Sequence, residues 1–469
     1  MTDQTLRAPA PSALAGRTVM PWLVAAGAYL VLLPLGGRLL NDADVYTHVV
    51  VGRSILANRA FPHLDTFSAT FAGQPWIAKE WGSQLIYTAA YSLGGWSAMA
   101  MLAAAATAAA LGLLAHALLR KLEPLPALGL TLAGFVLAAP HLVARPHVLA
   151  LPLMVAWTAG LIRAVDERRA PSFWLLPLML LWANLHGGFT LGLALIAPFA
   201  LEGILQDRKT APRWIGFGVA AGLTACITPY GPESILVTQR ILSLGDALDI
   251  IVEWRSQDFS RLEAFEILLL GGIGFALLRG VTLSPLRIVV LLGFLHLALA
   301  HVRSAEILGL LAPLLLGKPR EDAHAAPLPL LLRGVVVAAL AAASVFFALR
   351  HPAAPGASIT PAAALAAIEK AQPGPVLNDY GFGGYMLSAG VAPFIDGRTE
   401  LYGGAFTARH HRAVTLANLP DFLALLDEYK IGATLLSPER PAAALLDRLP
   451  GWERLYTDNI AVVHVRKRP

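Results

Sequence analysis

Acidic and imidazole side chains open the first long polar segment of the chain. Asp42 and Asp44 follow an apolar run, and His48 comes four residues after Asp44. On a helix, residues four apart lie on the same face. A carboxylate here is suited to act as a general base or, as the pair Asp42 and Asp44, to bind a divalent cation such as Mg²⁺ or Mn²⁺. Acidic residues in a first helical turn also interact favourably with the helix dipole, so a purely local role stays open.

The same segment carries a further acid between two aromatic residues. Glu80 lies between Trp76 and Trp81 and directly after Lys79, with which it can pair. Tryptophans at the edge of an apolar region usually anchor a protein in a membrane interface. The candidate catalytic residues are therefore Asp44, Asp42 and Glu80, and the candidate substrate-binding residues of this segment are His48 and Asp65.

Short turns between the later apolar runs carry compact polar groups. Arg145 and Arg303 are suited to bind a phosphate, because a guanidinium group matches its geometry. His147 and His186 are suited to hydrogen bonding or proton transfer. The histidines lack the H-x-x-x-H and H-E-x-x-H spacings that favour zinc. The candidate substrate-binding residues in these turns are Arg145, His147, His186, Glu233 and Arg303.

Composition identifies the environment in which these residues work. The 469 residues are 56% hydrophobic and only 14% charged, with a net charge of +5, and the mean hydropathy is +0.60. Soluble proteins carry roughly 25% charged residues, so the deficit indicates a lipid bilayer as partner. The basic residues form short clusters between apolar runs, which is typical of cytoplasmic loops and not of a nucleic-acid-binding face. The single cysteine, Cys226, excludes a disulfide within the chain.

The apolar stretches predict a polytopic α-helical membrane protein with about eleven transmembrane helices. With eleven crossings, every basic cluster in a short loop falls on one side, which the positive-inside rule makes cytoplasmic. The N-terminus is then cytoplasmic, and the first outer loop is residues 38–95. A single long helix over 173–205 would reverse the later topology, but residues 184–188 favour a turn. The stretches start near Val19, Trp96, Leu125, Val148, Phe173, Phe189, Trp214, Phe265, Leu286, Ile307 and Leu328.

The chain after residue 351 has the composition of a soluble domain. We therefore predict a transmembrane domain over 1–351 and an extracytoplasmic α/β domain over 352–469. Pro361 at N1 after Thr360 predicts a helix to about Gln372. The expected strands are Pro375–Leu377, Ala392–Ile395, Ala433–Ser437 and Ala461–Val465. The expected helices are Phe406–Leu416, Asp421–Tyr429 and Pro441–Leu449.

The distribution of polar residues separates three classes of function. A secondary transporter concentrates polar residues near the bilayer midplane, often in repeated halves. An enzyme that acts on a lipid-linked substrate gathers them on the outer face, as the predicted topology has them. A transporter or flippase of lipid-linked saccharides and a non-catalytic component of cell-envelope assembly remain as alternatives.

Three features of the sequence resemble the GT-C superfamily of membrane glycosyltransferases. The acidic pair opens a long outer loop, the helix number is odd, and a Gly- and Tyr-rich segment, residues 376–385, follows the last membrane helix. A second segment, residues 394–402, contains Arg398. Asp379-Tyr380-Gly381 is similar to the Trp-Trp-Asp-Tyr-Gly segment of oligosaccharyltransferase catalytic subunits, although the two tryptophans are absent here. Residues 381–384 can equally be a plain strand–helix connection.

The resemblance implies an enzyme that moves a sugar, a hexose or a pentose, from a polyprenyl-phosphate donor to an extracytoplasmic glycan, lipid or protein. It implies Asp44 as base, with Asp42 next, and places Arg145, His147 and Arg303 near the phosphate. It adds Asp379, Tyr380 and Arg398 to the candidate substrate-binding residues. The implied location is the inner (plasma) membrane of a bacterium, with the C-terminal domain in the periplasm.

Overall fold

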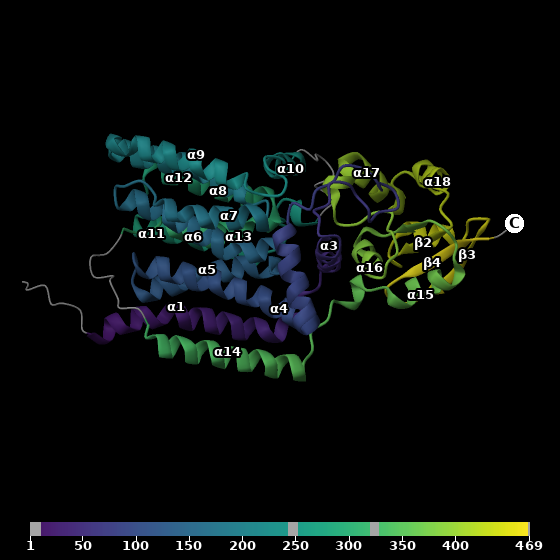
Figure 1. The fold of residues 1–469 in the computed structure, drawn as a ribbon, viewed down its shortest axis with the longest axis horizontal. Helices are drawn as coiled ribbons and strands as arrows, with labels where there is room; N and C mark the ends of the chain where they lie inside the picture. Colours follow the sequence, from purple (N-terminus) through teal and green to yellow (C-terminus); the bar gives the residue numbers. More distant parts are fainter. Residues whose placement is uncertain (1–10, 243–251, 319–327, 468–469) are drawn as a thin grey trace, which may run out of the picture.

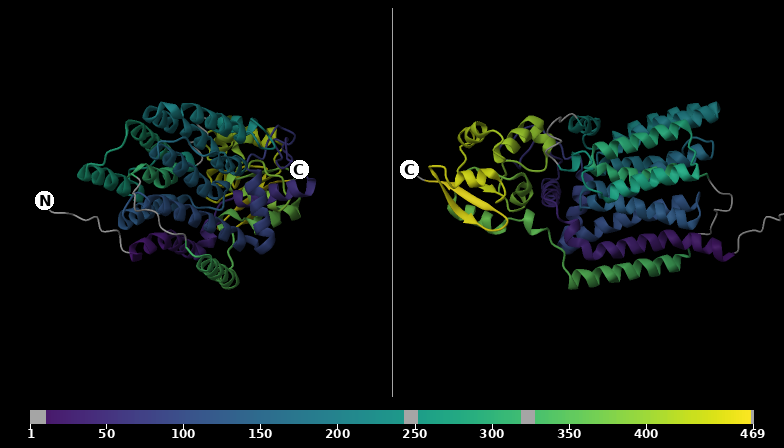
Figure 2. Two further views of the ribbon diagram at one scale, coloured as in Figure 1. Left: turned by 60° about the vertical axis from the view of Figure 1, so that its left-hand side comes forward. Right: turned by 180° about the vertical axis from the view of Figure 1, so that it is seen from behind.

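Apolar helices and a small sheet occupy opposite ends of an elongated molecule. The computed structural model describes residues 11–242, 252–318 and 328–467. The apolar helices run side by side along the long axis, and the chain after residue 351 forms the other end (Figure 1). Helix α3 (Asp44–Asn58) lies between the two ends, also when the molecule is seen from behind (Figure 2).

Leucine- and alanine-rich segments form the helical end. Prolines begin α5, α6 and α12, since the first N–H groups of a helix have no partner within it. The helices are α1 (Pro11–Leu32), α2 (Gly36–Leu39), α3, α4 (Trp81–Leu119), α5 (Pro124–Ala138), α6 (Pro146–Asp166), α7 (Leu176–Leu185), α8 (Phe189–Gln206), α9 (Ala211–Ala225), α10 (Glu233–Leu242), α11 (Ala264–Arg279), α12 (Pro285–Ala300), α13 (Ala305–Leu311) and α14 (Leu330–Arg350).

Several of these helices have the length and composition of membrane spans. Within the described residues, six helical segments are long and apolar enough to cross a membrane: Thr18–Leu39, Trp81–Leu119, Pro124–His141, Pro146–Asp166, Phe189–Gln206 and Leu330–Arg350. Leu330 and Leu349 on α14 are about four-fifths exposed, as expected for side chains that face lipid. Ten of the eleven predicted stretches begin on one of these helices or within two residues of one, and the stretch at Phe173 begins with a short 3-10 helix that leads into α7. The number that crosses the membrane stays a prediction.

Two helix boundaries clarify the predicted topology. Helix α4 begins at Trp81, but Gly94 and Gly95 have non-helical dihedral angles, so α4 is two helices joined at a kink. The second helix begins at Trp96, where the sequence predicts the start of an apolar stretch. The first outer loop therefore contains α3 and the first part of α4. Between α7 and α8, His186 has extended backbone angles, so 173–205 is two helices, as predicted.

The C-terminal end is a four-stranded sheet with helices around it. The strand order is β1-β2-β4-β3; β1 runs parallel to β2, and the other two pairs are antiparallel. Leu377 is in register with Thr434, and Thr434 with His464. The elements are α15 (Ala362–Ala371), β1 (Val376–Asn378), α16 (Gly383–Ser388), α17 (Thr399–Val414), α18 (Leu419–Glu428), β2 (Ala433–Leu436), α19 (Pro441–Leu446), β3 (Trp452–Thr457) and β4 (Val462–Arg466).

Three predictions in this region were wrong or incomplete. Ala392–Ile395 is not a strand; the Asn378 side chain instead accepts a hydrogen bond from the Phe394 amide at 2.7 Å and donates one to the Ile395 carbonyl at 2.8 Å. Strand β3 and helix α16 have no counterpart among the predicted elements. Helix α15 starts one residue later than expected, since the hydroxyl of Thr360 donates to the Gly356 carbonyl and pairs with Tyr46.

The hydrophobic core of the C-terminal end includes residues of the first outer loop. Val51 and Ile55 from α3 and Trp76 join Leu377 and Phe394 in one buried cluster. Burying these side chains together contributes roughly 1.5–3 kcal/mol for each large one. The loop and the tail therefore share one hydrophobic core. That residues 1–351 and 352–469 are separate domains stays a prediction.

Candidate active site

The acidic pair lies in the turn that enters α3. The Asp44 amide donates a hydrogen bond to Asp42 Oδ1 at 2.8 Å, so Asp42 also stabilises the turn locally. Both carboxylates also contact a side chain from another part of the chain. Burial raises the pKa of Asp42 to about 6, and the nearby Arg145 opposes that rise.

Arg145 binds three carboxylates with its guanidinium group. Its Nε lies 3.1 Å from Asp42 Oδ1, its Nη2 donates to Asp44 Oδ2, and its Nη1 donates to Glu253 Oε1. These carboxylates hold the pKa of Arg145 well above its ordinary value, although burial opposes the rise. The residues come from the turn before α3, the turn before α6 and the segment η6 (Val252–Trp254).

Backbone contacts fix the turn that carries Arg145. The Tyr87 hydroxyl donates to the Arg145 carbonyl at 2.9 Å, and the Ala144 amide donates to the Leu39 carbonyl at 2.6 Å. Pro146 then starts α6. Because residues of α4 and α2 both hold this turn, the backbone of Arg145 is fixed in a position from which its guanidinium group reaches the acidic pair.

Arg303 completes this cluster from the opposite side of Glu253. Its Nη1 lies 3.6 Å from Glu253 Oε2, and its guanidinium carbon lies 5.1 Å from the centre of the Trp254 ring. Burial raises the pKa of Glu253, but Arg145 and Arg303 lower it to about 2. Glu253 was not among the candidate site residues; its only signal was its place in a polar Glu-Trp-Arg turn.

A second charged group adjoins the acidic turn. Lys79 Nζ lies 2.8 Å from Glu400 Oε1 in α17, and Glu80 Oε1 lies 3.7 Å from His186 Nε2. Burial raises the pKa of Glu80; Lys79 opposes this, while the charges of Glu400 and Asp44 add to it. Glu400 was also missed, because nothing near it in the sequence links it to Lys79.

The predicted histidines occupy buried positions near these groups. His48 is 6% exposed and stacks on Tyr87, with ring centres 6.3 Å apart. Burial, together with Arg145 and Lys79, lowers the pKa of His48 to about 3, so the ring is neutral at physiological pH. His147 Nε2 lies 3.0 Å from the His141 carbonyl, and its ring centre is 6.1 Å from that of His186.

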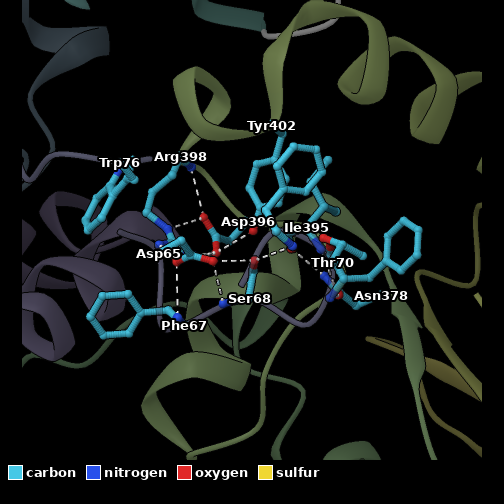
Figure 3. Close-up of polar contacts among 12 residues, drawn as sticks. Asp65, Phe67, Ser68, Thr70, Trp76, Asn378, Ile395, Asp396, Arg398 and Tyr402 are labelled. Atoms are coloured by element: carbon cyan, nitrogen blue, oxygen red, sulfur yellow. Dashed lines mark hydrogen bonds and ion pairs between the residues drawn. The ribbon is translucent and has the colours of Figure 1, made fainter. Parts of the chain in front are cut away.

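Asp65 and Arg398 form a buried ion pair that joins the outer loop to the tail (Figure 3). Arg398 Nη1 lies 2.5 Å from Asp65 Oδ1, and its Nη2 lies 2.6 Å from Asp396 Oδ2. Ser68 and Tyr402 donate their hydroxyls to Asp65 and Asp396. Asp65 and Asp396 have no exposed surface, and Arg398 is 5% exposed. This geometry supports a structural role for Asp65 and Arg398 in place of substrate contact.

The remaining predicted residues have separate surroundings. Asp379 is buried and bound by Arg440 through two nitrogens, at 2.6 and 3.0 Å. Tyr380 pairs with the Thr399 hydroxyl at 3.0 Å, and its pKa is raised by burial and by the charge of Asp44. Glu233 pairs with Arg240 at 2.8 Å on the surface of α10. Of these residues, Tyr380 is the one whose electrostatic environment includes the acidic turn.

Two glycines bring the tail into contact with the acidic turn. A Cβ atom on Gly397 would overlap with the Asp44 carboxylate, and one on Gly384 would overlap with the Ala43 carbonyl. Helix α16 packs directly on α3. The glycine-rich segment is thus both a strand–helix connection and the surface that docks on the candidate site.

The expected metal-binding pair does not fit a divalent cation in this arrangement. Asp42 and Asp44 both contact Arg145, whose charge opposes a second cation. Across the described ranges, no group of three or more His, Cys, Asp or Glu side chains is arranged to hold a metal ion.

The fold and the site together define a multi-pass membrane protein with a polar centre between its helices and its C-terminal sheet. The sequence matches no protein-family model and no curated protein. The structure is similar to the archaeal oligosaccharyltransferase AglB from Archaeoglobus fulgidus, solved with an inhibitory peptide and a dolichol-phosphate. The TM-score is 0.56 at 10% identity, over 90% of this chain and 69% of that one.

A second similar structure is ArnT from Cupriavidus metallidurans, solved bound to undecaprenyl phosphate. It aligns over 96% of this chain and 98% of its own, at 13% identity, and its TM-score of 0.32 is too low to define a shared fold. Both proteins are GT-C glycosyltransferases. The similarity to AglB confirms the GT-C resemblance at the level of the fold.

Proposed function

We propose that this protein is a glycosyltransferase that moves a sugar from a polyprenyl-phosphate donor to a glycan, lipid or protein acceptor outside the cytoplasm. The observation that carries the proposal is the acidic turn at Asp42 and Asp44, held by Arg145 at the junction of the apolar helices and the tail. The similar fold of AglB, solved with a dolichol-phosphate, supports a lipid-phosphate donor.

The proposed reaction replaces one bond to the sugar with another. The acceptor hydroxyl attacks the anomeric carbon and transfers its proton to a carboxylate. The bond from that carbon to the phosphate oxygen breaks, and the polyprenyl phosphate leaves with the electron pair. A base for the hydroxyl and cationic donors for the phosphate are therefore the two requirements of the site.

Asp44 is our proposed base, because it contacts Arg145 and its charge raises the pKa of Glu80 and of Tyr380. Arg145 and Arg303 are proposed to bind the leaving phosphate through their guanidinium N–H groups. Asp42 and Glu80 are the other proposed catalytic acids. His147 and His186 are proposed to contact the substrate as hydrogen-bonding groups, since both lie within the electrostatic reach of Arg145 and Arg303, the proposed phosphate ligands.

The function is tested with the purified protein in liposomes that contain polyprenyl-phosphate-linked hexoses or pentoses labelled in the sugar. An envelope fraction of the source cells supplies the acceptor. We expect label to enter the acceptor and unlabelled polyprenyl phosphate to appear in equal amount by mass spectrometry. Protein-free liposomes are the control. A protein that only moves the intact lipid-linked sugar across the bilayer would leave the sugar–phosphate bond unbroken, and that result would contradict the proposal.

We also propose that the protein lies in a bacterial inner membrane with its N-terminus in the cytoplasm and its tail outside. The basic loops between apolar stretches support this orientation. Alkaline phosphatase fused after Pro352 should be active, and the same enzyme fused after Arg169 should be inactive. The reverse pattern would overturn the orientation and move the acidic turn to the cytoplasmic face.

A further inference from the structure

We propose that the guanidinium group of Arg145 occupies the position that a divalent cation would take among Asp42, Asp44 and Glu253, so that the reaction needs no added metal ion. The expectation that transfer needs no metal ion rests on the proposed function. The expectation that Arg145 keeps a metal ion from binding to the three acids does not depend on that function.

The contacts of Arg145 have the form of a cation shared by carboxylates from separate elements. Each of its three nitrogens contacts a different acid: Nε contacts Asp42 at 3.1 Å, Nη2 contacts Asp44, and Nη1 contacts Glu253. The four side chains are 16–29% exposed, so water screens the charges only in part. A single positive group therefore neutralises acids that would otherwise repel one another.

A divalent cation would have to share all three acids of this cluster with Arg145. Magnesium and calcium require about six or more oxygen ligands, and each of the three carboxylates already contacts Arg145 through one oxygen. The guanidinium group stays charged at every physiological pH, so it would repel a metal ion at contact distance. The turn that carries it is fixed by hydrogen bonds from the Tyr87 hydroxyl to the Arg145 carbonyl and from the Ala144 amide to the Leu39 carbonyl.

Arg145 can perform the electrostatic work that a metal ion would perform for the leaving group. Its two hydrogen bonds to Asp44 and Glu253 leave other N–H donors for phosphate oxygens. The planar fork of the group suits two phosphate oxygens at once. Arg145 would then contact both Asp44, the proposed base, and the leaving phosphate. One side chain would thus hold the base beside the bond that breaks.

Mn²⁺ binding by electron paramagnetic resonance tests the inference in the detergent-purified full chain. The wild-type protein is expected to bind no more Mn²⁺ than Arg145→Ala/Glu253→Gln. Arg145→Ala alone exposes three carboxylates, so it should bind Mn²⁺ about tenfold or more tighter than wild type. Arg303→Ala, which removes a neighbouring guanidinium but keeps Arg145, is the matched control for Mn²⁺ binding alone, and its Mn²⁺ affinity should equal that of wild type. Wild-type transfer should be unchanged by EDTA, and Arg145→Ala should lower it on the order of 100-fold.

Two results would overturn the inference. One is a wild-type protein that binds Mn²⁺ and loses transfer in EDTA; the other is a folded Arg145→Ala that binds no more Mn²⁺ than the double variant. If Arg145→Ala does not fold, the wild-type measurements alone decide. A protein without transfer activity would contradict the proposed function, while Mn²⁺ binding would still test the place of Arg145.

Discussion

Replacing Asp44 with asparagine should lower sugar transfer about a thousandfold, within the 10²–10⁴-fold range of a general base. The asparagine side chain has the same shape, so its oxygen can still accept from Arg145 Nη2 and its volume still fits against Gly397. It cannot take a proton from the acceptor hydroxyl. The initial rate of label transfer in liposomes is the measurement, with donor binding followed separately to show that the site remains intact.

Asp258→Asn is the matched control, because Asp258 is exposed and bonds only its local turn through the Ser260 amide. It should transfer at the wild-type rate. Asp42→Asn should have a smaller effect than Asp44→Asn, since the charge of Asp44 raises the pKa of Glu80 and of Tyr380, whereas Asp42 is not among the main causes of either shift. An Asp44→Asn protein as active as wild type would remove Asp44 from the role of base.

Replacing Arg398 with methionine should destabilise the tail by about 3–5 kcal/mol, because it leaves two buried carboxylates without their cation. Asp65 and Asp396 are completely buried, and Arg398 also stacks on Trp76 with its guanidinium carbon 4.9 Å from the ring centre. Methionine keeps much of the volume, so the loss reports charge and not a cavity. Pulse proteolysis of the tail in increasing urea measures the change.

Arg409→Met, a substitution in α17, provides the comparison. Arg409 pairs with Asp421 and Glu428 but is 27% exposed, so its loss should cost at most about 1 kcal/mol. Equal effects of the two substitutions would show that the buried pair does not hold the loop to the tail.

The stabilisation from Asp65 also has a predictable direction with pH. Burial raises the pKa of Asp65, but Arg398 and the hydrogen bonds from Ser68 and Phe67 lower it below the ordinary value. The stabilisation is therefore complete above the pKa of the unfolded chain and is lost as the pH falls through the folded value. Arg398→Met should weaken this acid dependence.

Local sequence patterns predicted most of the elements. Long apolar runs without charge indicated the helices, because a helix satisfies its own backbone hydrogen bonds within one segment. In the tail, β1, β2 and β4 were predicted close to their observed bounds. Strand β3 is mostly exposed and lacks a period-two apolar pattern, and α16 is short, so both carried too weak a signal; the apolar run at 392–395 is held as a loop by Asn378.

The sequence by itself also determined that acids follow the first apolar stretch and that arginines and histidines occupy the turns between later ones. Only the tertiary structure decided which of them meet. Arg145 and Asp44 are 101 residues apart, Arg145 and Glu253 are 108 apart, and Arg398 and Asp65 are 333 apart. An ion pair leaves no periodic pattern in a chain, since it depends on how helices pack and not on spacing. Packing placed Asp65 and Arg398 in a buried clamp, brought Glu253 and Glu400 to the site, and set a guanidinium group among the acids that the sequence had suggested for a metal ion.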